Sequence, residues 1–196
     1  MGCVTPVLMA QSGIVADEPI LGKLCRMNSL SFSDVRYLRA AEGWLELGSP
    51  LAADAELDNI PPALRSHPDV LDIRFRIYRK AAKWDACLEI AQSIVKQAPD
   101  RASGWLHFAY SLRRVEGGSL QSAWDVLSPI AEKFPSVWGI PYNMSCYASM
   151  LGKFDEALHR FKRATAIDAH AVKKIAPHGP DLKPLWDSMT TKAQNE

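Results

Sequence analysis

The chain has 196 residues, of which 47% are hydrophobic and 23% are charged, a balance typical of a folded globular domain and unlike that of a disordered chain. Its 23 basic and 22 acidic side chains leave a formal net charge of +1, so no long-range field favours nucleic acid or an anionic membrane as the main partner. No run of about 18 apolar residues exists, which excludes a membrane-spanning helix on length.

Residues 1–32 form an N-terminal extension that proline and glycine interrupt and that lacks a sustained period. Four apolar residues near its end have helical spacing and predict a short helix over the following unit: Ile20, Leu21, Leu24 and Met27. The first sixteen residues contain no Lys or Arg, whereas a secretory signal begins with a positive segment. We therefore expect a cytoplasmic protein.

Regular helical spacing begins at residue 33, and the first unit, residues 33–67, contains two predicted helices. Ser33 or Asp34 is expected as the N-cap of the first helix, which ends near Gly48. Its expected apolar face consists of Tyr37, Ala40, Ala41 and Trp44. The second helix presents Ala53, Leu57 and Ile60, and the prolines that follow shorten it.

Two further units, residues 68–101 and 102–137, follow the same plan. The apolar faces of the second unit are Leu71, Phe75 and Tyr78, then Cys87, Ala91 and Ile94. Those of the third unit are Trp105, Phe108, Ala109 and Leu112, then Ala123, Leu127 and Ile130. The turn of the third unit ends near Gly118 and is about two residues longer than the others.

The fourth unit, residues 138–169, is the clearest copy, with its turn at Gly152 and with Ala157, Phe161 and Ala164 on one helix face. Residues 170–196 follow it as a predicted capping helix and tail. The stretch AHAVKKIA either extends the last helix or begins a new one, and PHGP ends it. The later stretch DLKPLWDSM has Leu182, Leu185, Trp186 and Met189 at helical spacing, and we expect Trp186 to anchor the cap.

A common register relates the four units. The small residue near the start of each second helix recurs at intervals of 34, 36 and 34 residues: Ala53, Cys87, Ala123 and Ala157. The predicted turn residues keep the same intervals: Gly48, Ala82, Gly118 and Gly152. A helix pair of this length cannot bury its apolar face alone, so its copies must stack.

This pattern resembles the tetratricopeptide repeat (TPR) family, most clearly in LGKFDEALHRFKRATAID and KWDACLEIAQSIVKQAPD. The resemblance covers about residues 34–169 and implies an all-α, right-handed α-solenoid of four helix-turn-helix repeats. Three positions depart from the family pattern. Phe75 replaces a small residue, Arg74 an apolar one, and Pro141 a Trp or Leu.

Few residues have the spacing of a catalytic or metal site. The phosphate-binding GxGxxG and GxxxxGK[ST] loops, the GxSxG elbow and HExxH are all missing from the sequence. Glu156 and His159 form one ExxH step, whereas di-iron sites use two, and no CxxC pair begins a zinc site. Cys87 and Cys146 stand where small apolar residues belong, which favours packing. We therefore expect a non-catalytic protein without metal or cofactor.

The resemblance implies a concave surface, lined by the first helix of each pair, that binds a peptide or helix of another protein. Its candidate residues are Arg76, Arg79, Lys80, Tyr110, Arg113, Arg114, Tyr142 and Asn143, and the wider lining includes Leu38, Glu42, Leu45, Cys146 and Ser149. Because the middle of this surface is basic, we expect a partner with an acidic segment.

Three other interpretations stay open at this stage, the least favoured being an enzyme whose site is formed only in space by residues far apart in the sequence. The arginines also fit the solvated side of two helices, without a ligand. A second basic patch, residues 159–163 with Lys173 and Lys174, suggests as an alternative a nucleic-acid-associated helical-repeat protein, but helical spacing buries Phe161 and leaves no exposed aromatic side chain there to stack on a base.

Overall fold

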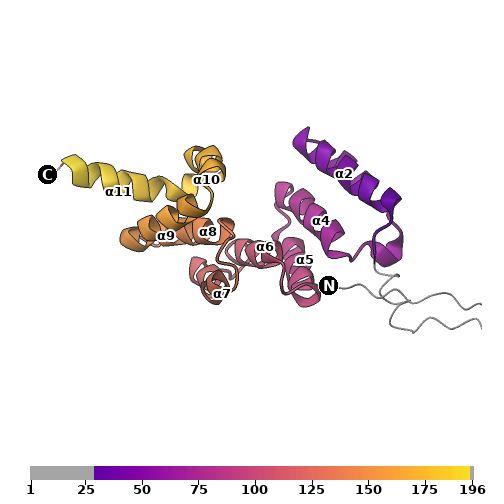
Figure 1. Ribbon diagram of the computed structural model, residues 1–196, viewed down its shortest axis with the longest axis horizontal. Coiled ribbons are helices and arrows are strands. Elements are labelled where there is room, and N and C mark those ends of the chain that lie inside the picture. Colours follow the sequence, from indigo (N-terminus) through magenta and orange to yellow (C-terminus); the bar gives the residue numbers. More distant parts are fainter. Residues whose placement is uncertain (1–28, 195–196) are drawn as a thin grey trace, which may run out of the picture.

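A computed structural model describes residues 29–194, and every regular element in that range is helical (Figure 1). Four helix pairs follow one another, and a C-terminal group completes the stack. The pairs are α2 (Phe32–Glu46) with α3 (Pro50–Leu57), α4 (Pro68–Lys80) with α5 (Trp84–Gln97), α6 (Ala102–Leu112) with α7 (Leu120–Lys133), and α8 (Gly139–Met150) with α9 (Phe154–Ile167). The C-terminal group is α10 (Ala169–Ile175), the 3-10 turns η2 (Ala176–His178) and η3 (Pro180–Leu182), and α11 (Lys183–Gln194), while a third 3-10 turn, η1 (Pro62–Leu64), follows α3.

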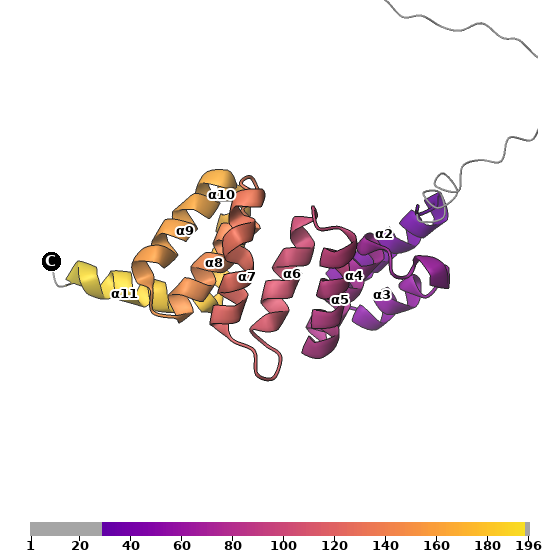
Figure 2. The same cartoon turned by 90° about the horizontal axis from the view of Figure 1, so that it is seen from below.

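The pairs stack into two layers. The first helices, α2, α4, α6 and α8, form the inner layer, and the second helices, α3, α5, α7 and α9, form the outer one, so that the chain advances along the long axis in sequence order (Figure 2). The small residues of the common register, Ala53, Cys87, Ala123 and Ala157, are all fully buried. Their small side chains let the inner and outer helix of each pair approach closely. The stack of repeats predicted from the period is therefore confirmed.

Helix α2 begins earlier than the N-cap prediction placed it. Ser31 is the N-cap: its Oγ accepts a hydrogen bond from the Asp34 amide at 3.2 Å, and its own amide donates to Asp34 Oδ2 at 2.8 Å. This reciprocal pair is a capping box. The prediction of Ser33 or Asp34 as N-cap was wrong, because Asp34 supplies the return bond of the box from the third helical position.

The apolar face of α2 also differs from the prediction. Asp34, Leu38, Ala41 and Leu45 are buried, whereas Trp44 is 39% exposed. Leu38 and Leu45 form part of one core cluster with Ile73 and Ile77 of α4. They therefore contribute to the core between the first two inner helices, and Leu38 also borders a hollow of the concave surface.

The turns inside the pairs are short, except in the third. Three residues connect the helices at 47–49, 81–83 and 151–153, whereas residues 113–119 connect α6 with α7. The left-handed residues are Gly48, Ala82, Gly117 and Gly152, with φ values of 80°, 53°, 72° and 72°. The third turn thus places its left-handed residue at Gly117 and not at Gly118, because the longer connection changes the register there.

The C-terminal group is built on α8 and α9. Asp168 ends α9 and caps α10 through its Oδ1, which accepts the Ala171 amide at 2.9 Å, so AHAVKKIA begins a new helix. Leu182 and Leu185 are fully buried, and the Trp186 ring meets the Phe161 ring edge-on with centroids 5.0 Å apart. Met189, which the spacing placed on the same face, is 42% exposed.

No helix among the described residues is both long and apolar enough to cross a bilayer. The predicted helix over Ile20, Leu21, Leu24 and Met27 lies outside the described residues.

Candidate functional site

Three inner helices, α4, α6 and α8, together with α10 line an open cavity of about 370 Å³ on the concave side of the solenoid. Figure 1 shows α4 on one side of this surface and α10 on the other, with α6 and α8 between them. Five of the eight predicted site residues line the cavity: Arg76, Arg79, Tyr110, Tyr142 and Asn143. The other lining residues are Phe75, Leu106, His107, Trp138 and Ile175.

Two pairs of aromatic side chains that contact each other line the cavity. The rings of Phe75 and His107 lie parallel with centroids 3.8 Å apart, and those of Trp138 and Tyr142 meet edge-on at 5.9 Å. Phe75 replaces the small residue that is usual in a TPR, and it is only 2% exposed. Its bulk fills the junction of α4 with α6 and supplies the surface on which His107 stacks.

The two arginines of the cavity differ in their partners. Arg76 Nη1 donates to Glu42 Oε1 at 3.2 Å, which links α4 to α2. The guanidinium of Arg79 lies 5.8 Å from the centre of the Tyr110 ring, and no carboxylate of the described residues forms an ion pair with it. Arg79 therefore offers an exposed positive charge at the edge of the cavity.

Arg113 is bound within the protein. Its side chain is 7% exposed, and its Nη2 donates to Asp181 Oδ2 of η3 at 2.7 Å. Its Nη1 lies 3.4 Å from the sulfur of Met150, and its guanidinium lies 5.4 Å from the centre of the Tyr147 ring. We assign Arg113 to the attachment of the C-terminal group, because its charge is already neutralised there.

Arg114 and Lys80 also have partners within the chain. The guanidinium of Arg114 lies 3.7 Å from the centre of the Tyr110 ring and 5.1 Å from that of Trp84. Burial, followed by the neighbouring charge of Arg113, lowers the pKa of the Arg114 guanidinium. Lys80 Nζ donates to the Leu45 carbonyl at 2.9 Å, which satisfies an acceptor in the last turn of α2. Neither residue lines the cavity.

The chain itself covers much of the expected lining on α8. Tyr142, Cys146 and Ser149 are buried because η3 and the start of α11 lie against this helix. Ser149 Oγ accepts the Leu185 amide at 3.1 Å. Burial raises the pKa of the Tyr142 hydroxyl, and it raises the pKa of the Cys146 thiol to about 12. Of the α8 residues in the predicted site, Asn143 is half-buried, and Tyr142 lines the cavity but is 8% exposed.

A second hollow, of about 330 Å³, adjoins the first and shares Arg76 with it. Most of its charged groups are paired with one another, whereas Arg39 forms no ion pair among the described residues. Arg101 forms ion pairs with Asp69 and with Asp72, the latter at 3.5 Å, and Arg76 pairs with Glu42. Sequence reasoning missed Arg101, because it lies in the connection before α6 and not on a helix face. This part of the concave surface is therefore electrically balanced.

The side chains that could act in catalysis contact one another in a way that does not form a nucleophilic triad. Asp72 lies between two other polar side chains, 3.1 Å from Ser103 Oγ and 3.1 Å from His107 Nε2. In a nucleophilic triad the histidine lies between the serine and the carboxylate, so here the imidazole is not positioned to take the proton of the hydroxyl. Burial raises the pKa of the Cys87 thiol to about 11, and with Cys146 near 12 both thiols stay protonated at neutral pH.

No cluster of three or more His, Cys, Asp or Glu side chains suited to a metal ion occurs within residues 29–194. The carboxylate of the ExxH step has another partner, since Arg160 Nε donates to Glu156 Oε1 at 2.6 Å. His159 is exposed on the same helix, α9.

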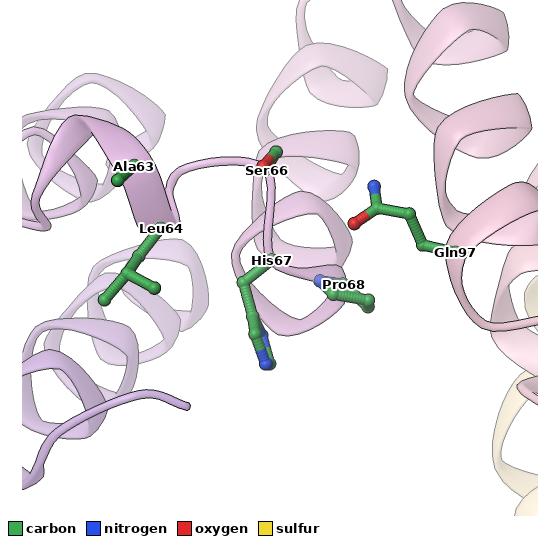
Figure 3. A pocket seen from close by; sticks show the side chains of 6 residues that line it. All are labelled: Ala63, Leu64, Ser66, His67, Pro68 and Gln97. Carbon is green, nitrogen blue, oxygen red and sulfur yellow. The ribbon is translucent and has the colours of Figure 1, made fainter. Parts of the chain in front are cut away.

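A smaller hollow of about 210 Å³ lies where η1 leads into α4, with Gln97 of α5 at its edge (Figure 3). The histidine in this hollow has a local role. His67 Nδ1 accepts the Asp69 amide at 3.2 Å and so caps α4. The hollow brings together none of the predicted site residues.

Comparison with known proteins gives structural matches only. No protein-family model matches the chain, and no curated protein sequence matches it. A crystal structure of a thermophilic TPR protein from Thermus thermophilus is similar over 69% of this chain and 75% of its own length, with a TM-score of 0.61 and 22% identity.

Two MamA structures are also similar to this chain. MamA of MSR-1 matches 85% of this chain and 100% of its own length, with a TM-score of 0.52 and 18% identity. A MamA RS-1 double mutant matches 83% and 99%, with a TM-score of 0.55 and 13% identity. The chain therefore has the TPR-type fold, an all-α solenoid of stacked helix pairs.

Proposed function

We propose that the chain is a non-catalytic protein-interaction module that binds a peptide or helix of another protein on its concave surface. The observation that carries the proposal is the cavity shared by α4, α6, α8 and α10. Three successive inner helices contribute to it, so a segment bound there would run across the stack and contact several repeats at once. A function as an adaptor or assembly factor fits such a surface.

The side chains of the cavity suit a protein ligand. Tyr110 and Trp138 offer flat apolar surfaces with polar tips, and Arg79 offers a guanidinium without a carboxylate partner among the described residues. Tyr, Trp and Arg are the residues most enriched at the energetic centres of protein interfaces. The positive charge favours a partner with an acidic segment.

The arrangement of the titratable groups supports a non-catalytic role. His107 is held between the Phe75 ring and the Asp72 carboxylate, and both described thiols have pKa values far above neutrality. His107 lines the cavity, but its ring is stacked on Phe75 and its Nε2 faces Asp72, so each of these groups serves packing or pairing.

The test compares a groove variant with a matched outer-surface variant. Arg76→Glu/Arg79→Glu reverses two charges at the cavity, and Lys96→Glu/Lys162→Glu reverses two exposed charges on the outer helices α5 and α9. Each protein is immobilised and exposed to a nuclease-treated lysate, so that capture through nucleic acid does not count. Circular dichroism and the melting temperature verify that the variants are folded.

The proposal expects specific proteins to be retained by the wild type and by Lys96→Glu/Lys162→Glu, and to be absent from Arg76→Glu/Arg79→Glu. Retention of the same proteins by all three would overturn it, because binding would then take place away from the cavity. Retention that depends only on the outer lysines would move the interface to the convex side.

A further inference from the structure

Arg79 and Arg113 occupy the same place in consecutive repeats. They are 34 residues apart, Arg79 in the last turn of α4 and Arg113 at the C-cap of α6. Both guanidinium groups lie beside the same ring, 5.8 Å and 5.7 Å from the centre of Tyr110. Consecutive repeats thus place an arginine at the same position beside one aromatic residue, exposed in the case of Arg79 and nearly buried in the case of Arg113.

The chain itself shows what the second of these arginines binds. Arg113 holds the carboxylate of Asp181, and the next residue, Leu182, is fully buried against the inner surface of the last repeat. Leu185 is fully buried as well, and its amide donates to Ser149 Oγ. Within this chain, therefore, the arginine at this position binds an acidic side chain, and the next residue buries an apolar side chain against the neighbouring helices.

Arg79 lies beside the same aromatic ring as Arg113, but no carboxylate of the described residues binds to it. It also borders the 370 Å³ cavity. Four of its lining residues have large, mainly apolar side chains: Leu106, Trp138, Tyr142 and Ile175.

We propose that the partner segment places an Asp or Glu carboxylate on Arg79 and a large apolar side chain in the adjoining cavity, as Asp181 and Leu182 do one repeat later. This inference rests on the proposed function and specifies the partner's chemistry. A carboxylate complements Arg79, because the neighbouring Arg76 and Arg113 are paired with Glu42 and Asp181 and Arg114 lies over the Tyr110 ring. A charge-assisted hydrogen bond to a carboxylate is also among the stronger polar contacts.

The experiment begins with random peptides displayed on phage and selected on the full chain. The enriched peptides are synthesised with amidated C-termini, and their affinities are measured by fluorescence anisotropy. The proposal expects enrichment of an Asp or Glu next to a Phe, Trp, Leu or Ile. Enrichment without an acidic residue, or no enrichment, would overturn it.

A double-mutant cycle then tests the contact itself. Arg79→Gln should weaken binding of the selected peptide about tenfold or more, as should the Asp→Asn or Glu→Gln change in the peptide. The two changes together should cost little more than either alone. Arg36→Gln, which changes an exposed arginine of α2, is the matched control and should leave the affinity unchanged. Additive losses in the cycle would contradict the assignment of the carboxylate to Arg79.

A cavity variant separates this inference from the proposed function. Asn143→Phe adds bulk to the cavity wall, while the wild-type side chain it removes only donates to the Gly139 carbonyl of its own helix. If Asn143→Phe abolishes binding and Arg79→Gln does not change it, the cavity binds peptides but the carboxylate contact is wrong. If neither variant changes the affinity, both proposals fail.

Discussion

Arg113 Nη2 donates to Asp181 Oδ2 at 2.7 Å, a contact that joins α6 to η3 across 68 residues of sequence. The Arg113 side chain is 7% exposed and that of Asp181 is 25% exposed. Because the guanidinium is nearly buried, removal of its counter-charge leaves a desolvated cation without a partner. The pair therefore attaches the C-terminal group to the repeat that precedes α8.

We predict that Asp181→Asn lowers the free energy of unfolding by about 2 kcal/mol, because a hydrogen bond to a buried charged group is worth more than an exposed one. Urea denaturation followed by circular dichroism measures the change. Asp187→Asn is the matched control: its ion pair with Lys183, 3.5 Å long, is exposed, and its loss should cost less than about 0.5 kcal/mol. Equal costs for the two variants would show that Arg113 does not depend on Asp181.

Trp186 provides a second test of the C-terminal group. Its ring meets Phe161 edge-on at 5.0 Å and is partly buried against the last repeat. We predict that Trp186→Ala destabilises the fold by about 2 kcal/mol, less than a fully buried tryptophan would. It should leave the affinity for a groove peptide within a factor of two. Met189→Ala, on the exposed side of the same helix, should change stability by less than about 0.5 kcal/mol.

The turn residue Ala82 adopts a left-handed conformation, with φ of 53°, where the other pairs have glycine. A side chain costs roughly 1 kcal/mol in this region, so Ala82→Gly should raise the free energy of unfolding by up to that amount. Gly48→Ala should have the opposite effect, because a Cβ there meets open space and only the backbone conformation opposes it. Chemical denaturation of both variants checks the opposite signs, and a destabilised Ala82→Gly variant would contradict this account.

The described cysteines lead to a prediction on pH. Burial raises the pKa of Cys87 from 9.0 to about 11 and that of Cys146 from 9.0 to about 12. Below pH 9 both thiols are protonated in the folded and the unfolded chain, and above it the unfolded chain loses protons first. Stability should therefore fall as the pH rises from about 9 towards 11.

The burial that raises these pKa values can be tested separately by the rate at which a disulfide reagent modifies the thiols. In a Cys3→Ser/Cys25→Ser background, a disulfide reagent at pH 8 should modify Cys87 and Cys146 slowly in the native protein and rapidly in urea. In a Cys87→Ala/Cys146→Ala variant, the free energy of unfolding should fall less between pH 9 and 11 than in the wild type, because the two thiols no longer contribute. Rapid modification of the native protein would show that the thiols are accessible.

The period of the small residues predicted the helix pairs, because packing between the two helices of a pair imposes the same steric demand in every repeat. Ala53, Cys87, Ala123 and Ala157 satisfy this demand and are fully buried. The prediction of the buried face of α2 was wrong for a different reason. Both sides of this helix carry apolar residues, and the spacing of Tyr37, Ala40 and Trp44 is as helical as that of the buried residues.

The site was predicted only in part. Arg76, Arg79, Tyr110, Tyr142 and Asn143 meet in one cavity because inner-helix positions repeat with the period. The roles of Arg113 and Lys80 depend on partners without a periodic signal, a carboxylate 68 residues later and a helix-end carbonyl 35 residues earlier. Helical spacing predicted a C-terminal cap with Leu182 and Leu185, but not that residues 179–185 would fold over α8 and cover part of the expected lining.

The most direct test of the central claim is a nuclear magnetic resonance titration of the full chain with a selected peptide. We predict that the amide signals that shift most belong to the inner helices, with Arg79, Tyr110 and Asn143 among them, and that signals of the outer helices stay in place. Shifts confined to α3, α5, α7 or α9 would contradict the claim that the concave cavity is the binding surface.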